Sequence, residues 1–223
     1  MSDLRLVIFD VDGTLVDSQG DIVGSMTRAF DVVGLAVPDR SEILSVVGLS
    51  LEVIMPRLAP DASAQDHALM VETYKTAYQE LRAAKGSILS SPLYPGARDV
   101  LDTLQAEPET LLGVATGKSR RGLDTLLDGH ELRGYFVTEQ VSDYHPSKPH
   151  PAMLSEALSE TGMDADRAVM IGDTSFDIDM AKAAGLKAIG VSWGYHARDK
   201  LAEADVVIDR FEELLPVLNE MLG

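Results

Sequence analysis

Two aspartates, Asp10 and Asp12, follow directly after an apolar run, residues 6–9, near the start of this 223-residue chain. The valine, isoleucine and phenylalanine of that run are typical of a buried strand. Side chains alternate along an extended chain, so two acids spaced i and i+2 would share one face. Gly13 then lets the chain turn away. Paired carboxylates at a strand end are poor core residues, but they suit a site that holds a cation beside a nucleophile.

A second polar cluster follows the apolar run 111–115. Thr116 offers a hydroxyl group, and Gly117 lets backbone N–H groups approach an anion closely. Ser119 suits the N-cap of a helix, and the N-terminus of a helix favours negative charge. A strand that simply turns into a capped helix shows the same pattern, so this cluster alone identifies no site.

A lysine and two further aspartates complete the set of candidates. Lys148 lies among three prolines that restrict its backbone, and a fixed ammonium is a good point charge for phosphate. Asp173 ends the apolar run 168–171, where an oxygen ligand for a hard cation would be useful. Asp177 reaches the same place if a helix begins at once. Taken singly, each also has an ordinary explanation, as a loop lysine or a helix N-cap.

Three of the four clusters follow strand-like runs, and the Lys148 cluster comes just before the helical pattern at 151–161. Helical patterns separate the strand-like runs. The strands are expected to end near Phe9, Ala115, Ile171 and Val191, with a weaker one over residues 205–208. Strands that alternate with helices predict an α/β fold, a Rossmann-like parallel sheet with helices on both faces. The clearest helices are expected at residues 97–106, 119–128, 151–161, 175–184 and 211–222. Right-handed crossovers bring the carboxyl ends of such strands to one edge, where the four clusters are expected to meet.

Residues 18–86 break this alternation, because they show helical spacing and no strand pattern. A first helix contains the spaced apolar residues from Met26 to Val33, and the longest runs from about Ala64 to Ala84. Shorter helices are predicted at 41–46 and 51–58. We therefore expect a small α-helical cap domain inserted after the first strand.

The boundaries of this cap follow from loop signals on either side of it. The predicted cap occupies residues 17–91, and the Rossmann-like core is formed by residues 1–16 and 92–223. Hinges are expected at residues 16–19 and 86–96, since the second of these contains Pro and Gly residues typical of loops.

Charge and composition limit the possible partners. The formal net charge is −17, from 36 acidic and 19 basic residues, so we expect no nucleic-acid partner. A phosphate-bearing substrate would need a local positive centre, formed by a metal ion and a few selected bases. The chain has no cysteine, no signal peptide and no apolar run long enough to span a bilayer, so a cytoplasmic protein without a membrane partner is expected. Monomer and homodimer both stay open.

As an ordered set, the four clusters resemble the motifs of the haloacid dehalogenase-like superfamily. The segment from Asp10 to Thr14 resembles the first motif, Thr116 the second, Lys148 the third, and Gly172-Asp173 through Asp177 the fourth. The predicted helical insert is similar to the small α-helical cap of the family in position and type. Within the superfamily, residues 115–119 and 190–195 look most like phosphoglycolate-phosphatase-type members.

The resemblance implies an Mg²⁺-dependent phosphatase acting on a small phosphorylated metabolite, phosphoglycolate-like or a sugar phosphate. It implies that Asp10 is a nucleophile that forms an aspartyl-phosphate, and that Asp12 is the general acid and then the general base. It further implies that Mg²⁺ is held by the carboxylates of Asp10 and Asp173 and by the backbone carbonyl of Asp12.

The resemblance also assigns the groups that would hold the transferred phosphate. These are Thr116, the amide of Gly117, and Lys148, with Asp177 orienting Lys148 or a metal-bound water. They would compensate the charge on the phosphoryl oxygens during transfer.

Substrate specificity is expected to come from the cap, because the four motifs set the reaction and not the leaving group. Gly48 permits a close approach to substrate, and Lys118 would extend the positive field toward a second anionic group. Arg40 and Arg57 are further candidates for contacts with a carboxylate or phosphate. Closure of the cap would exclude water from the reaction.

The presence of Asp12 distinguishes among the branches of the superfamily that the resemblance allows. Dehalogenases lack an acid there, because halide leaves without a proton, so phosphate chemistry is favoured. A phosphomutase of the β-phosphoglucomutase type also keeps this aspartate and stays an alternative. A non-catalytic phosphate-binding protein that kept the scaffold is a third possibility, although binding alone does not need the complete set of acids and lysine.

Overall fold

The computed structural model describes residues 4–223 and contains one six-stranded parallel sheet. Its strands are β1 (Arg5–Phe9), β2 (Thr110–Thr116), β3 (Thr138–Val141), β4 (Ala168–Gly172), β5 (Lys187–Val191) and β6 (Val206–Ile208). They lie in the order β3-β2-β1-β4-β5-β6. The chain therefore builds one half of the sheet from β1 outward and then returns to place β4 on the other side of β1. Ligands bind at such a point of reversal in open α/β sheets.

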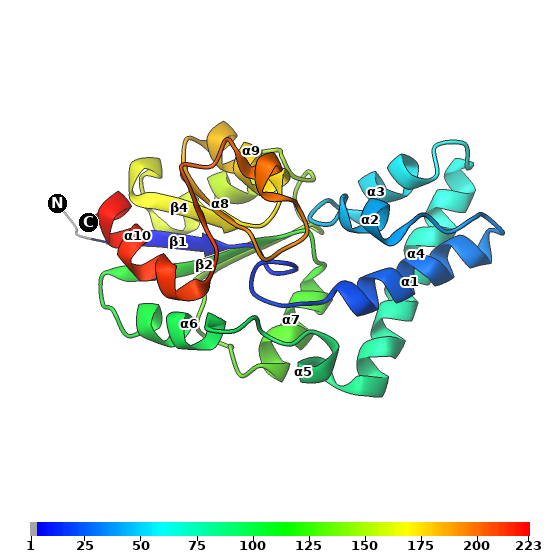
Figure 1. The fold of residues 1–223 in the computed structure, drawn as a ribbon, viewed down its shortest axis with the longest axis horizontal. Helices are drawn as coiled ribbons and strands as arrows, with labels where there is room; N and C mark the ends of the chain where they lie inside the picture. The colour runs from blue at the N-terminus through cyan, green and yellow to red at the C-terminus, as the bar shows by residue number, and fades with distance from the viewer. Residues whose placement is uncertain (1–3) are drawn as a thin grey trace.

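Helices cover both faces of the sheet, which confirms the predicted α/β, Rossmann-like class (Figure 1). The core helices are α6 (Ala97–Gln105), α7 (Arg120–Gly129), α8 (Ala152–Thr161), α9 (Ser175–Ala184) and α10 (Leu214–Leu222), and short 3-10 turns occupy Ala165–Arg167, Arg198–Leu201 and Phe211–Glu213. The alternation along β1 shows the two sides. Val7 and Phe9 belong to the apolar cluster under α6, α7 and α10, whereas Leu6 and Ile8 belong to the cluster under α8 and α9.

Strand β3 was not expected from the sequence. Its four residues include Glu139 and Gln140 and therefore lack the apolar run that marks the other strands. It lies at the edge of the sheet and pairs only with β2, where Gly113 faces Thr138 in the register. A short edge strand with polar residues carries too weak a signal for periodicity to detect.

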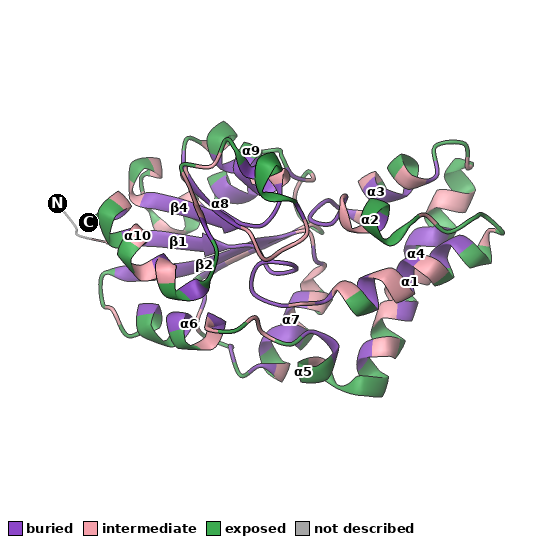
Figure 2. Ribbon diagram, viewed as in Figure 1, coloured by how far each residue is buried: buried purple, intermediate pink, exposed green. Residues whose placement is uncertain are grey.

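The helical segment between β1 and β2 lies beyond the carboxyl edge of the sheet (Figure 1). It comprises α1 (Gln19–Val32), α2 (Arg40–Leu44), α3 (Leu51–Leu58), α4 (Ala64–Lys85) and α5 (Ser87–Ser90). Buried positions alternate with exposed ones along α1 and α4 (Figure 2), as expected for helices that bury one face. These helices share an apolar cluster distinct from the two beside the sheet. The exact boundaries of the cap, 17–91, stay a prediction.

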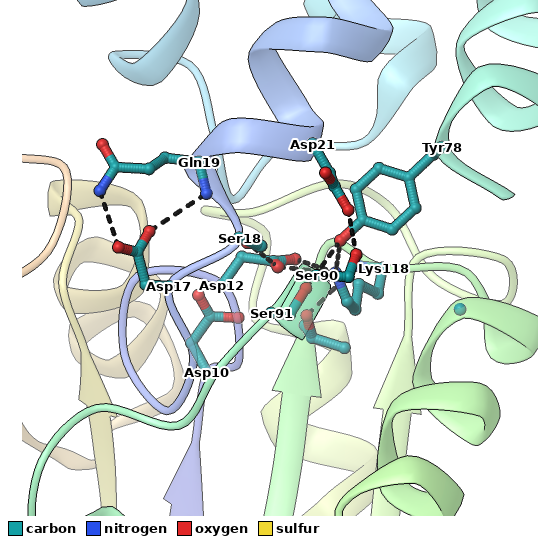
Figure 3. Close-up of polar contacts among 12 residues, drawn as sticks. Asp10, Asp12, Asp17, Ser18, Gln19, Asp21, Tyr78, Ser90, Ser91 and Lys118 are labelled. Carbon is teal, nitrogen blue, oxygen red and sulfur yellow. Dashed lines mark hydrogen bonds and ion pairs between the residues drawn. The ribbon is translucent and has the colours of Figure 1, made fainter. Parts of the chain in front are cut away.

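The second connection between cap and sheet differs from the expected loop, because α5 occupies part of residues 86–96. Four residues are too few to give a periodic pattern, so the sequence did not indicate this helix. Asp21 of α1 holds the segment in place. Its buried carboxylate accepts a hydrogen bond from the hydroxyl of Ser90 (Figure 3) and another from Lys85 Nζ, at 2.8 Å. The two chain crossings into the cap therefore lie side by side.

No helix within residues 4–223 is a candidate membrane span. None of them combines the length and hydropathy that a bilayer span requires.

Candidate active site

The site begins where β1 and β4 run side by side. Asp10 directly follows β1, and its backbone N–H donates to the carbonyl of Ile171 at 2.9 Å, which continues the ladder by one residue. Asp173 directly follows β4. The neighbouring strands thus place two aspartates from distant parts of the sequence at the point where the order of the sheet reverses.

Three carboxylates meet at this point. Oxygen atoms of Asp10, Asp173 and Asp177 lie within 4.8 Å of one another, and all three residues are buried. Lys148 adds its ammonium to the cluster: its Nζ lies 2.8 Å from Asp10 Oδ1 and donates to Asp177 Oδ1 at 2.6 Å. The structure therefore brings together the candidates from three of the four motifs.

Asp173 is held firmly by its surroundings. Its carboxylate accepts hydrogen bonds from the backbone N–H of Tyr195, at 2.7 Å, and from the Thr14 hydroxyl, at 3.0 Å. Gly13 and Gly194 approach so closely that a Cβ atom on either would overlap the Asp173 side chain. Such packing fixes the direction of the carboxylate.

Asp177 belongs to the capping box at the start of α9. Its Oδ2 accepts from the backbone N–H and the hydroxyl of Thr174, at 3.1 and 2.7 Å, while its Oδ1 accepts from Lys148. The helix start therefore orients Asp177, and Asp177 in turn orients the lysine. The positioning role expected for Asp177 requires such a contact.

In this cluster three carboxylates, those of Asp10, Asp173 and Asp177, lie around a single ammonium, that of Lys148. Burial raises the pKa of Asp10 to about 7, which the nearby Lys148 ammonium partly opposes, and burial also raises the pKa of Asp173. Within residues 4–223, the Lys148 ammonium is the partner of Asp10 Oδ1, whereas the buried Oδ2 of Asp10 has no partner. Three carboxylates that share one ammonium, with Asp10 Oδ2 unsatisfied, fit a hard divalent cation such as Mg²⁺.

Asp12 has different partners from Asp10. Both of its carboxylate oxygens accept from Lys118 Nζ, at 2.6 and 2.7 Å, and Oδ1 also accepts from the Ser18 hydroxyl (Figure 3). The chain leaves the strand at Phe9, so the two acids are not held together by the alternation of an extended strand. Lys118 also donates to the hydroxyl of Tyr78 in α4, at 3.1 Å, which links Asp12 to the cap.

The loop after β2 and a loop of the cap face each other across the site. Thr116 accepts the N–H of Lys118 at 3.2 Å through its hydroxyl, so it is engaged within its own loop. Gly48 adopts a φ of +100° and lies next to Thr174 and the backbone of Gly117. A residue with a side chain would be strained at this φ.

A cavity of about 660 Å³ separates the cap from the carboxyl edge of the sheet. Its floor contains Asp10, Asp12, Thr116, Gly117 and Lys118. Apolar and aromatic side chains dominate its cap wall: Ile22, Met26, Ile43, Val47, Leu49, Leu51, Ile54, Tyr74 and Tyr78. The volume falls in the range of small-molecule sites.

The residues predicted to set substrate specificity divide into two groups. Gly48 and Lys118 line the cavity, whereas Arg40 and Arg57 are exposed and are not among its lining residues. Arg40 donates instead to Gln19, and Arg57 lies 5.9 Å from the ring centroid of Phe176. Neither arginine reaches the site in this arrangement.

Three residues of the site were missed by sequence reasoning: Ser18, Tyr78 and Arg82. Tyr78 was visible only as one apolar position of the long helix, and its hydroxyl contact depends on tertiary packing. Arg82 stands near the end of α4, where a basic residue has an ordinary explanation as a partner of the helix dipole.

Comparison with known protein families shows to which family this chain belongs. Residues 7–191 match the family model described as haloacid dehalogenase-like hydrolase. This chain belongs to that family. The match contains every cluster at the sheet edge, so the resemblance inferred from the four motifs is confirmed.

Similar curated proteins align with almost the whole length of this chain. The protein named "Probable phosphatase IndB" of Dickeya dadantii (strain 3937) is 37% identical, over 97% of this chain and 94% of that protein. A "Phosphoglycolate phosphatase" of Aliivibrio fischeri (strain ATCC 700601 / ES114) is 30% identical, over 97% of each.

Solved structures show the same haloacid dehalogenase-like architecture. A predicted phosphatase from Clostridium acetobutylicum superposes with a TM-score of 0.85 at 25% identity, covering 97% of this chain and 99% of the other. A β-phosphoglucomutase from Clostridium difficile superposes with a TM-score of 0.84 at 19% identity, covering 98% and 97%. At that identity, the mutase shows only that the fold is shared.

Proposed function

We propose that this chain is an Mg²⁺-dependent phosphatase that hydrolyses a small phosphate ester through an aspartyl-phosphate on Asp10. The observation that carries the proposal is the environment of Asp10. Its buried carboxylate has the Lys148 ammonium 2.8 Å from Oδ1, has no partner for Oδ2 within residues 4–223, and lines the floor of the cavity. Relatives named as phosphatases, 37% and 30% identical, support the same reaction class.

The proposed metal ligands are the carboxylates of Asp10 and Asp173 and the backbone carbonyl of Asp12. Bound Mg²⁺ would neutralise charge and so allow an anionic carboxylate to approach an anionic phosphate. Asp177 completes the carboxylate cluster, but both of its oxygens already accept hydrogen bonds. We therefore assign Asp177 to positioning Lys148.

In the first step, a carboxylate oxygen of Asp10 attacks phosphorus in line with the ester bond. A bond forms between Asp10 and phosphorus, and the bond between phosphorus and the alcohol oxygen breaks. The leaving oxygen takes a proton from Asp12, so the alcohol departs uncharged.

In the second step, Asp12 accepts a proton from a water molecule whose oxygen attacks the same phosphorus atom. The bond between phosphorus and Asp10 breaks, and inorganic phosphate leaves. Asp12 thereby recovers the proton that it gave to the alcohol, and Asp10 returns to its carboxylate form. The two steps consume one water and one ester.

The charge on the phosphoryl oxygens needs donors throughout both steps. We assign this to Lys148, the Thr116 hydroxyl and the amide of Gly117, which lie at the same edge of the sheet. Lys148 is 2% exposed, so its charge acts where water does not screen it.

The cap supplies the other wall of the cavity, and we propose that residues 17–91 close over the core as a unit. Its separate apolar cluster supports this division, since a body with its own core is able to move without unfolding. Closure would exclude water during the first step.

The proposal is tested by turnover of para-nitrophenyl phosphate with and without Mg²⁺. We expect hydrolysis that EDTA abolishes, and loss of nearly all turnover in Asp10→Asn with the circular dichroism spectrum unchanged. Asp179→Asn is the matched control, because Asp179 is exposed on α9 and lies outside the cluster. Equal turnover in Asp10→Asn and the native protein would overturn the assignment.

The same assay separates the alternatives. A phosphomutase would require a sugar bisphosphate and would return phosphate to a sugar, whereas a phosphatase releases inorganic phosphate to water without it. A non-catalytic phosphate-binding protein would bind phosphate and show no turnover. Phosphoglycolate and sugar phosphates are the first natural substrates to try, since relatives are named for phosphoglycolate.

A further inference from the structure

Arg82 is a buried arginine in the wall of the cavity, and most of its donors have no partner. It is 6% exposed and lines the cavity from the end of α4. Its Nη1 donates to the carbonyl of Gly122 in α7 at 3.0 Å, and its guanidinium lies 5.3 Å from the ring centroid of Tyr78. Nε and Nη2 are buried without a hydrogen-bond partner anywhere in residues 4–223. A buried charged group with unsatisfied donors is costly, so acceptors from outside the chain are expected.

Arg82 has no carboxylate partner among the described residues, although the chain has 36 acidic and only 19 basic residues. The acids that line the cavity already have other partners: Asp10 with Lys148, Asp12 with Lys118, Glu52 with Lys75, and Asp143 with the backbone N–H of Arg120. Arg121 of α7 also lines the cavity, is exposed, and forms no ion pair within the described residues. Two arginines beside the cavity therefore have positive charge to offer to a ligand.

The free donors of Arg82 have a specific shape. Nε and Nη2 form one edge of the planar guanidinium, and the N–H bonds of such an edge are parallel. This geometry matches the two oxygens of one carboxylate, or two oxygens of one phosphate. An uncharged hydroxyl would satisfy only one of the donors and would leave the charge unpaired.

We infer that Arg82, assisted by Arg121, binds a second anionic group of the substrate, a carboxylate or phosphate carried on its alcohol part. This inference rests on the proposed function and adds the substrate class: a phosphate ester with a second oxyanion. Nothing in the four motifs of the core assigns this role.

The second oxyanion differs from the phosphate that reacts. The reacting phosphate meets Asp10, whose ammonium partner is Lys148. Arg82 has different partners from the groups around Asp10 and Asp12. The Lys118 ammonium lies 4.9 Å from the Tyr78 ring centroid and contacts Asp12, whereas Arg82 lies against the same ring and contacts α7. The apolar cap wall is left for the carbon chain between the two anions.

The test compares kcat/KM, with Mg²⁺ present, for three series of esters matched in length. One series is propyl, butyl and pentyl phosphate; the second carries a terminal carboxylate; the third carries a terminal phosphonate, which is not an ester. We expect the native protein to prefer one of the doubly anionic series at least tenfold at its best length. The series that is preferred distinguishes carboxylate from phosphate recognition.

Arg82→Met should lower that preference ratio tenfold or more, and Arg82→Lys should lower it less, because lysine keeps the charge and loses the paired donors. Arg28→Met is the matched control, because Arg28 is an exposed cap arginine that pairs with Glu80 outside the cavity. We expect this variant to keep the preference ratio of the native protein. If Arg82→Met does not fold, as judged by its unfolding transition, Arg82→Lys and Arg121→Met provide the test. Arg121 is exposed, so folding should tolerate its replacement.

Two outcomes separate this inference from the proposed function. Hydrolysis of propyl phosphate with no preference for either anion, or with an equal ratio in native protein and the arginine variants, overturns the inference and leaves the phosphatase assignment intact. No hydrolysis of any ester by the native protein overturns the phosphatase assignment and the inference together.

Discussion

The backbone of Gly117 lies directly against the carbonyl group of Gly48: a Cβ atom added at Gly117 would be 2.7 Å from that oxygen. Gly117 belongs to the loop after β2, and Gly48 belongs to the cap. The obstacle is backbone and not a flexible side chain. A methyl group at this position therefore cannot be accommodated unless the cap moves away from the core.

Gly117→Ala should hold the cap open and slow the reaction. We expect kcat/KM for para-nitrophenyl phosphate to fall by about 10²-fold, the scale of a misplacement of about 1 Å in an active site. The unfolding midpoint should change little, because the three apolar clusters stay intact. Gly20→Ala is the control: Gly20 has open space around it, and we expect native activity. Native activity in Gly117→Ala would show that closure is not limited by this contact.

Lys148→Met should destabilise the metal-free protein strongly. Lys148 is the ammonium partner of Asp10 and Asp177, and its side chain is fully buried. Removing it leaves buried carboxylates without their counter-charge, which costs about 3–5 kcal/mol. Urea unfolding in EDTA measures this loss, and Mg²⁺ should restore part of it.

Lys182→Met provides the comparison for that measurement. Lys182 and Asp205 form an ion pair at 2.7 Å with both side chains about two-fifths exposed, at 41% and 39%. Exposed pairs contribute about 0–1 kcal/mol, so its unfolding free energy should stay within that range. Similar losses in the two variants would contradict the view that the site carries buried, unbalanced charge.

His130 should lower the free energy of unfolding at acidic pH. Its buried ring lies with Nε2 2.8 Å from the carbonyl of Ser91, which only accepts, so Nε2 donates. Burial lowers the pKa of His130; the Ser91 carbonyl opposes this, and the charges of Arg98 and Arg82 add to it. The unfolded state then binds more protons below about pH 6.5, so the unfolding free energy falls as pH falls.

Replacing His130 isolates this effect from the other titrating groups. In His130→Gln, which keeps a side-chain N–H donor, the loss of unfolding free energy between pH 7.5 and 5.5 should be smaller than in the native protein. For one proton the difference is at most about 1.4 kcal/mol per pH unit. Urea unfolding at both pH values provides the measurement, with the exposed His150→Gln as control. Parallel pH profiles for native and His130→Gln would rule the effect out.

The sequence predicted those features that are encoded locally. Apolar runs followed by Asp10, Thr116 and Asp173 revealed both the strands and the edge where their polar residues meet. The parallel order brought these groups together as expected, because crossover handedness leaves few alternatives. Strand β3 escaped notice, since its polar edge sequence lacks the period on which such predictions depend.

The cap side of the site was not predictable in the same way. Arg40 and Arg57 looked as suitable as Arg82 from charge alone, and only packing shows that Arg82 lines the cavity while the others face solvent. The pairing of Lys118 with Asp12 likewise joins residues far apart in the chain. Contacts between side chains on separate elements leave no periodic trace in a sequence.

Asp12 should matter most for esters whose alcohol leaves poorly. As a general acid it protonates the leaving oxygen, and an alkyl alcohol needs that proton far more than para-nitrophenol does. Asp12→Asn should therefore lower the first step for propyl phosphate by about 10²–10⁴-fold, the usual contribution of general acid catalysis, and much less for para-nitrophenyl phosphate. Rapid mixing of enzyme and ester measures release of the alcohol in that step. Ser18→Ala is informative beside it, because Ser18 donates to Asp12 and its replacement should slow the first step less than Asp12→Asn, since the acid is kept. An equal loss for both esters would show that Asp12 does not protonate the leaving oxygen.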